Sequence, residues 1–332
     1  MISDKNKRMI GLDIYRILCC LGVLVYHTID DTFAYLGTVF NSSIAIYFYA
    51  SFCVPGFFML SGYLIVKEPL KRFDYYCKKI LIIAGKLAGW VIFCCLINFL
   101  FANKVLNPFE QYIYCFYSKG ILPVGWFLFS YMLLMFFAYP LTCIFQNSTV
   151  FSLIITSVLL FFISIPNRIT FILLSQTQSL WIHLYLTYFI VGILIKQLSL
   201  KYTINSPYII HLCIVGHFFA LVYYFNTIIN SEIFLLPESY YGSWFYSIYL
   251  ITSFYLVSKM EITNVYLRRA VEIISNGTFV VYMMHLPILN LITRFYPINS
   301  LIKGVLVILF LFIGCEIMFL LLMRIPLLNK LI

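Results

Sequence analysis

Long apolar runs of about twenty residues, separated by short polar connections, dominate the chain. A helical run of this length matches the hydrocarbon core of a bilayer, about 30 Å thick, and a helix satisfies its own backbone polar groups in lipid. The pattern therefore predicts an all-α fold, a polytopic helical membrane bundle with about ten spans. These cover approximately residues 10–29, 43–66, 79–101, 124–144, 150–165, 179–197, 207–228, 242–258, 273–293 and 300–324.

The distribution of Lys and Arg over the connections predicts the orientation. With the N-terminus in the cytoplasm, fifteen of these cations fall on the inside and five on the outside, which is the bias expected for cytoplasmic loops. We therefore expect both termini in the cytoplasm and a multi-pass protein of the inner (cytoplasmic) cell membrane. Residues 1–332 are expected to form one membrane-embedded domain, with 1–9 as a cytoplasmic tail and no soluble extracytoplasmic domain.

Composition supports the same class and excludes others. The chain is 63% hydrophobic and only 10% charged, with a mean hydropathy of +0.98, values typical of integral membrane proteins. A net charge of +10 does not indicate nucleic-acid binding, because the cations lie in the connections. The ten cysteines show no C-x-x-C spacing, so neither a disulfide framework nor a metal site is expected.

The first apolar run, residues 11–28, carries Asp13, Arg16 and His27 inside a segment otherwise suited to lipid. The eleven-residue step from Arg16 to His27 rotates a helix by roughly 20° and climbs roughly 16 Å, so both side chains share one face. The residues within about 60° of that line are Asp13, Cys20, Val23, Asp30 and Asp31. Ionisable groups at membrane depth usually face a protein interior or a wet cavity and carry function. Snorkelling of Arg16 to the headgroups is the structural alternative.

Three further stretches hold candidate residues. Ser61, Gly62 and Tyr63 end the second run, and the basic loop after it, which includes Lys78 and Lys79, can attract an anionic donor. A small-residue packing face and a topology signal are the structural alternatives. Trp126 opens the fourth run and His285 lies inside the ninth. Taken alone, Trp126 is typical of an aromatic belt, and a single membrane histidine is more often a helix-to-helix hydrogen bonder than a catalyst.

Taken in order, the R-x10-H spacing of Arg16 and His27 and the segments VPGFFMLSGYL, GWFLFSYMLLMFFAYPL and ISNGTFVVYMMHLPIL resemble the membrane acyltransferase-3 family. The chain looks most like short stand-alone bacterial members that O-acetylate surface polysaccharides or their lipid-linked precursors. One departure is Ile17, where the family usually has Gly. The resemblance implies about ten helices, cytoplasmic acetyl-CoA as the consumed acyl donor, and a sugar hydroxyl as acceptor. It also implies essential roles for Arg16 and His27, with Ser61, Gly62 and Tyr63 at a serine-glycine-aromatic position and His285 at a late-histidine position.

These observations suggest a mechanism. An extended pantetheine arm spans on the order of 15 Å, comparable with the climb from Arg16 to His27, so Arg16 can hold donor phosphate while His27 meets the thioester. A neutral imidazole, whose ordinary pKa is about 6.5, suits a general base. Asp30 or Asp31 can fix its tautomer, with Asp13, Trp126 and His285 in supporting roles. An acyl-histidine relay is the competing mechanism.

The expected partners are acyl-CoA, a carbohydrate acceptor, membrane lipid and proteins of polysaccharide assembly. Two other classes stay open. In a transporter or flippase of envelope glycans, the polar stripe of the first span would line a path, and no acyl-CoA would be needed. In a structural subunit of an envelope-polymer assembly, the stripe would pair with a partner helix, and mutation of Arg16 would break assembly rather than turnover.

Overall fold

The computed structural model describes residues 8–33, 48–66, 71–102, 104–147, 151–152, 154–156, 158, 182–201, 206–230, 244–298, 300–326 and 328–331. All regular elements in these ranges are helical, which confirms the all-α prediction. The α-helices, in chain order, are α1 (Ile10–Phe33), α3 (Cys53–Ile65), α4 (Phe73–Ala102), α5 (Pro108–Phe116), α6 (Trp126–Asn147), α9 (Ile182–Lys201), α10 (Ser206–Asn230), α12 (Trp244–Ser258), α13 (Val265–Phe295) and α14 (Leu301–Leu322). Two short 3-10 helices, η1 (Pro123–Gly125) and η3 (Leu328–Leu331), complete the described elements.

The helices support a multi-pass membrane protein. In the described ranges, six helices are long and apolar enough to cross a membrane, judged by length and composition. Three of the other predicted spans coincide with shorter apolar stretches, Tyr185–Leu200, Pro207–Val222 and Phe245–Ser258. The predicted fifth span, residues 150–165, lies mostly outside the described residues.

One boundary differs clearly from its prediction. Helix α13 begins at Val265, eight residues before the predicted start of the ninth span at 273. Its first two turns carry Arg268, Arg269 and Glu272. Because these residues are charged, the first two turns were not included in the predicted apolar span. The side chain of Asn264 accepts a hydrogen bond from the Leu267 amide at 3.0 Å and caps the helix. The helix therefore starts at a polar cap, and its apolar part begins only later.

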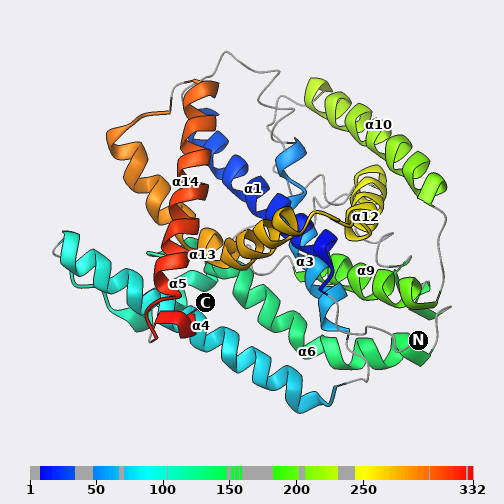
Figure 1. Ribbon diagram of the computed structural model, residues 1–332, viewed down its shortest axis with the longest axis horizontal. Coiled ribbons are helices and arrows are strands. Elements are labelled where there is room, and N and C mark those ends of the chain that lie inside the picture. Colours follow the sequence, from blue (N-terminus) through cyan, green and yellow to red (C-terminus); the bar gives the residue numbers. More distant parts are fainter. Residues whose placement is uncertain are drawn as a thin grey trace.

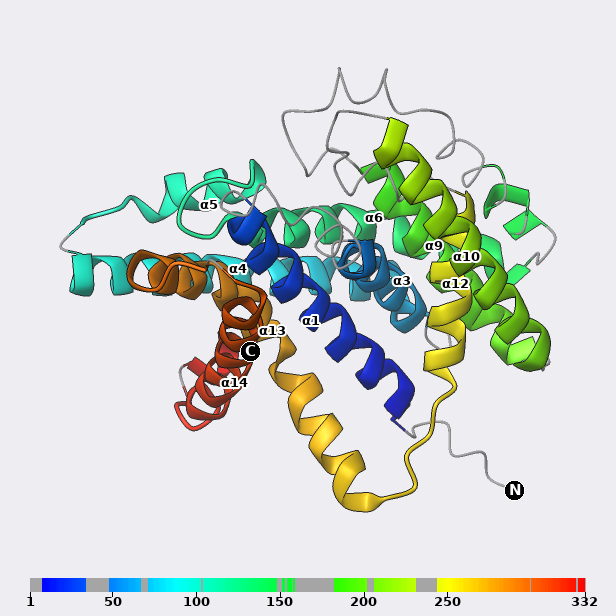
Figure 2. The ribbon, with the colours of Figure 1, turned by 90° about the horizontal axis from the view of Figure 1, so that it is seen from above.

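Helix α1 lies in the middle of the molecule and packs against α13, α3, α14 and α12 (Figures 1 and 2). Its sides differ as the sequence predicts: Asp13, Cys20 and Val23 are buried, whereas Leu18 is 41% exposed. The predicted polar stripe of α1 is therefore turned into the protein and away from lipid.

Helix α3 crosses α9 at very close range. A Cβ atom on Gly62 would overlap the backbone carbonyl of Phe189, and one on Gly192 would overlap that of Met59. Small residues let two membrane helices approach backbone to backbone. This contact accounts for the glycines at positions 62 and 192.

Replacing Gly62 by alanine is therefore expected to destabilise the fold by about 1–3 kcal/mol or more, because the new methyl group meets backbone atoms of α9 that cannot rotate away. Thermal unfolding of the purified protein in detergent measures the change. Gly85→Ala on α4 is the matched control, because a Cβ there has no neighbour within 4 Å. Equal melting temperatures for the two variants would contradict the close crossing.

Helix α13 consists of two limbs that run in different directions (Figure 2). Pro287 lies inside the helix, where it removes one backbone hydrogen bond and crowds the preceding turn, so a kink is expected there. The limb before the kink follows α1, and the limb after it leads toward the connection to α14 (Figure 2).

Candidate active site

The polar stripe of α1 faces a second polar stripe on α13. On α13, Ser275, Thr278 and His285 recur at spacings of three and seven residues, which places them on one helix face. In order along the interface, contacts join Arg16 to Ser275, Cys20 to Thr278 and His27 to His285. The two ends of this interface hold different chemistry, with guanidinium and carboxylate groups at one and imidazoles at the other.

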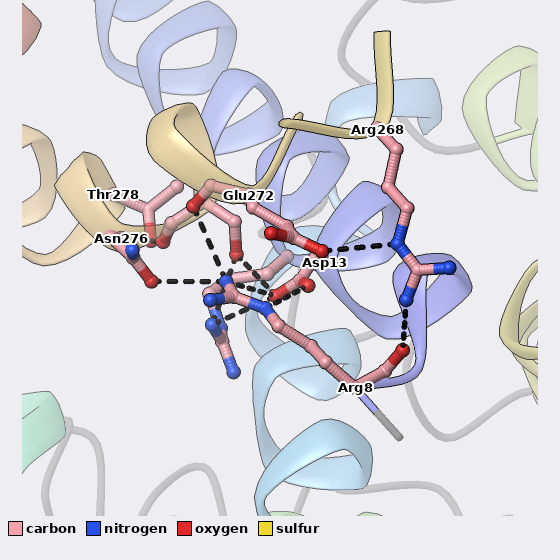
Figure 3. A network of polar contacts seen from close by, with 8 residues as sticks. Arg8, Asp13, Arg268, Glu272, Asn276 and Thr278 are labelled. Atoms are coloured by element: carbon pink, nitrogen blue, oxygen red, sulfur yellow. Dashed lines mark hydrogen bonds and ion pairs between the residues drawn. The ribbon is translucent and has the colours of Figure 1, made fainter. Parts of the chain in front are cut away.

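Asp13 is the centre of the charged end. Its carboxylate is only 5% exposed and accepts hydrogen bonds from Arg8 Nε at 2.6 Å, Arg8 Nη2 at 3.0 Å and Ser275 Oγ at 2.7 Å. Arg16 Nη1 lies farther away, at 3.4 Å. A buried carboxylate requires such partners, and here they link the start of α1 to α13 (Figure 3).

Arg8 extends the network along the first turns of α13. Its Nη2 also donates to the Glu272 carbonyl at 3.3 Å and to Asn276 Oδ1 at 3.0 Å, and its own carbonyl accepts from Arg268 Nη2 at 3.0 Å (Figure 3). The hydrogen bond to Asp13 raises the pKa of Arg8, so the guanidinium stays charged. Because 38% of its side chain is exposed, this cation also reaches the surface.

One edge of the Arg16 guanidinium contacts protein groups, and the other edge has unused N–H donors. Nη1 donates to Ser275 Oγ at 3.0 Å and lies near Asp13, and 28% of the side chain is exposed. Its Nε and Nη2 groups donate no hydrogen bond to any other residue in the described ranges. A guanidinium has five N–H donors in a fixed plane, so donors remain for a ligand.

At the other end, the rings of His27 and His285 lie side by side. Their centroids are 5.2 Å apart and their planes make an angle of 39°. His285 is fully buried, while His27 is partly exposed. The two imidazoles come from positions 258 residues apart in sequence and meet only because α1 docks on α13.

The surroundings of His285 define its tautomer. Nδ1 lies 2.7 Å from the Tyr282 carbonyl and 3.2 Å from the Val281 carbonyl. A carbonyl can only accept, so Nδ1 carries the proton and Nε2 presents a lone pair. Nε2 is buried without a hydrogen-bond partner in the described ranges. A buried acceptor left open beside a second imidazole fits a group that receives a hydrogen bond from a ligand.

Aromatic side chains form the wall next to this pair. The Tyr282 hydroxyl donates to the Val124 carbonyl at 2.9 Å and so ties η1, just before α6, to α13. The Phe127 ring lies 5.3 Å from the Tyr282 ring. Trp126, a predicted supporting residue, packs on Tyr185 of α9 at 5.5 Å; among the described ring contacts it meets neither histidine.

The Ser61–Tyr63 segment makes its described contacts away from the histidine pair. Ser61 Oγ donates to the Phe57 carbonyl one turn earlier, at 2.7 Å, and Gly62 serves the crossing with α9. The Tyr63 hydroxyl contacts Met9 Sδ at 3.6 Å, and Lys196 Nζ lies 5.0 Å from the centre of its ring. Tyr63 is therefore at the charged end of α1, because Met9 directly follows Arg8 in the chain.

The remaining candidates stand apart. Lys79 Nζ lies 5.1 Å from the Tyr75 ring on the same helix, Lys78 is exposed, and neither joins the hydrogen-bond network of Asp13 in the described ranges. Asp30 and Asp31 belong to α1, but their side chains lie outside the described residues. Across the described ranges, no group of three or more His, Cys, Asp or Glu side chains is arranged to hold a metal ion.

Arg8 and the first turns of α13 belong to the site, although the sequence pattern did not indicate them. In the sequence, Arg8 contributes only to the excess of cations that predicts the orientation. The available signal was the spacing of Arg268, Glu272 and Asn276, which repeat every fourth residue just before the apolar part of the ninth span and so form one polar helix face.

Comparisons with known proteins gave a family match. A family model described as an acyltransferase domain, acyltransferase-3, matches residues 9–323, from the charged end of α1 to the end of α14. No curated protein and no solved structure matches the chain.

Proposed function

The chain belongs to the acyltransferase-3 family, and from this premise we propose that it transfers an acetyl or similar short acyl group from acyl-CoA to a sugar hydroxyl. The acceptor is a cell-surface polysaccharide or its lipid-linked precursor, modified in the inner (cytoplasmic) membrane. The observation that carries this proposal is the pair of adjacent imidazoles, His27 and His285, at one end of a helix interface whose other end presents guanidinium groups. Acyl transfer needs a base at the reacting carbonyl and cations for the donor phosphates.

The charged end suits the nucleotide part of the donor. Arg8 is partly exposed and Arg16 keeps unused donors, and guanidinium groups bind phosphate through paired hydrogen bonds. The rise of α1 from Arg16 to His27 is about 16 Å, which matches an extended pantetheine arm. The donor would therefore lie along the α1–α13 interface, with its thioester at the imidazoles.

At the imidazoles, His27 acts as general base. It accepts the proton of the acceptor hydroxyl while that oxygen attacks the thioester carbonyl. The new C–O bond forms, the C–S bond breaks, and the imidazolium returns the proton to the departing thiolate, so no net proton is consumed. His285, with Nδ1 bonded to carbonyl groups and Nε2 open, accepts a hydrogen bond from a neighbouring hydroxyl of the same sugar and so positions the acceptor.

An acyl-histidine relay is the competing route through the same residues. In that route His27 attacks the thioester itself and then passes the acyl group to the acceptor. Acid-quenched protein would carry label from acetyl-labelled donor in the absence of acceptor, and direct transfer would leave the protein unlabelled.

The reaction itself can be tested with membranes that contain the chain. Given acetyl-CoA labelled in the acetyl group, they are expected to place label on a glycan fraction as a base-labile ester with an O-acetyl proton NMR signal. Membranes without the chain are the control. Glycan movement across liposomes in the absence of any acyl donor, with no ester formed, would instead indicate a flippase.

A further inference from the structure

An apolar groove of about 880 Å³ lies between the second limb of α13 and the first half of α14. This volume is within the range of small-molecule sites, about 300–1,000 Å³. The residues that line it are aliphatic or aromatic apart from Gly314, and include Ile288, Leu291, Ile292, Leu306 and Phe310.

Two sequence features create the groove. The kink at Pro287 turns the second limb of α13 aside, so that this limb and α14 diverge (Figure 1). On α14, Gly314 supplies no side chain, and a Cβ built there has no neighbour within 4 Å. The space is therefore left open by a proline on one helix and a glycine on the other.

The groove lies beside the helix segments that carry the histidine pair. Ile288, which lines it, follows His285 by three residues on α13, less than one helical turn. On the other side, the start of α14 approaches the end of α1, because a Cβ on Gly304 would lie 3.9 Å from the methyl group of Thr28, the residue after His27. A molecule in the groove therefore lies next to the segments of α13 and α1 that carry His285 and His27.

Two cations flank the groove. Lys303 Nζ lies 5.1 Å from the ring centre of Tyr296, which lines the groove, and exposed Arg294 ends the second limb of α13. Between residues 288 and 314 the sequence has these two cations and no carboxylate. Hydrocarbon walls with cations at one end complement a lipid whose headgroup is a phosphate.

We propose that this groove binds the hydrocarbon chain of a lipid-linked sugar phosphate and holds its phosphate beside Lys303. The sugar then extends from the phosphate toward the end of α1, where its hydroxyl reaches His27 and His285. The inference rests on the proposed function, and names its acceptor class as a polyprenyl-phosphate-linked glycan.

Photolabelling in nanodiscs tests the site without any acyl donor. The full chain is placed in phosphatidylethanolamine and phosphatidylglycerol discs doped with a diazirine-bearing polyprenyl phosphate, irradiated, and analysed by peptide mass spectrometry. We expect labels on the peptides of α13 and α14 that line the groove. Gly314→Leu, which fills the groove, should lower this labelling roughly tenfold, while Gly85→Leu, the same change at an open glycine of α4, should not. Lys303→Gln should lower it and Lys303→Arg should retain it.

Displacement of the probe by unlabelled lipid tests the site on the unmodified chain, even if a variant fails to fold. Unlabelled polyprenyl phosphate should displace the probe, whereas equal amounts of phosphatidylglycerol should not. Equal displacement by both lipids would show an ordinary annular lipid site and overturn the proposal. Labels elsewhere, or a second copy of the chain cross-linked at the groove, would also overturn it.

The two proposals can fail separately. Groove labelling without acetyl transfer in any membrane would contradict the proposed function alone, and transfer without groove labelling would contradict this inference alone.

Discussion

Replacing His27 by alanine is expected to lower acyl transfer by roughly 10²–10⁴-fold, the usual contribution of a general base, with little change in acetyl-CoA binding. The imidazole is partly exposed next to His285, so its removal leaves no polar group unpaired that the fold itself requires. The donor phosphates, by contrast, would bind at the opposite end of the α1–α13 interface. Turnover with labelled acetyl-CoA and equilibrium binding of the same donor, measured on the same preparation, separate the two effects.

His211→Ala is the matched control for this experiment. His211 is an exposed imidazole on α10 whose Nδ1 lies 2.7 Å from the Pro207 carbonyl, so the same substitution removes a membrane-helix histidine outside the site. We expect full activity from it. His285→Ala should have an intermediate effect on kcat, because His285 would position the acceptor sugar through a hydrogen bond from a neighbouring hydroxyl to Nε2. Normal turnover in His27→Ala would remove His27 from the mechanism whatever the other variants do.

The local features of this fold were predictable from the sequence, and α1 shows why. A 3.6-residue period needs no knowledge of neighbours, so the shared face of Asp13, Arg16 and His27 follows from spacing alone. The burial of Asp13 and the contacts of Arg16 and His27 with α13 agree with that face. Apolar length was equally informative for the long helices, since it reflects the thickness of the membrane.

The partner of each residue was not predictable, because docking depends on contacts far apart in sequence. The His27–His285 pair joins positions near the two ends of the chain. The first turns of α13 were missed for another reason: Arg268 and Glu272 make a segment too polar for an apolar window, yet they lie at the charged end, where Arg268 pairs with Glu272 at 3.2 Å. A search for long apolar segments excludes charged residues, and charged residues are the ones that form a site at a membrane surface.

Asp13→Asn is expected to destabilise the protein by on the order of 2 kcal/mol and to weaken donor binding. The substitution keeps the shape of the side chain but removes the charge that Arg8 and Arg16 share. Breaking a fully buried ion pair costs about 3–5 kcal/mol, and the effect here is smaller because both guanidinium groups can reach water. Unfolding in detergent measures the stability. Asp74→Asn is the control, because its ion pair with Arg72 is long, 4.0 Å, and both side chains are well exposed, a kind of pair that contributes little.

A double-mutant cycle with Arg8→Gln decides whether Asp13 acts through this network. Arg8 donates to Asp13 from two nitrogen atoms, at 2.6 and 3.0 Å, so the two substitutions should be strongly non-additive, with a coupling of roughly 0.5–3 kcal/mol. Asp13 also joins α1 to Ser275 of α13, and the alignment of Arg16 with His27 along α13 depends on that docking. The loss of stability in Asp13→Asn should therefore be accompanied by a higher KM for acetyl-CoA. Additive effects on stability, with donor KM unchanged, would mean that the carboxylate neither links the two helices nor organises the cationic end.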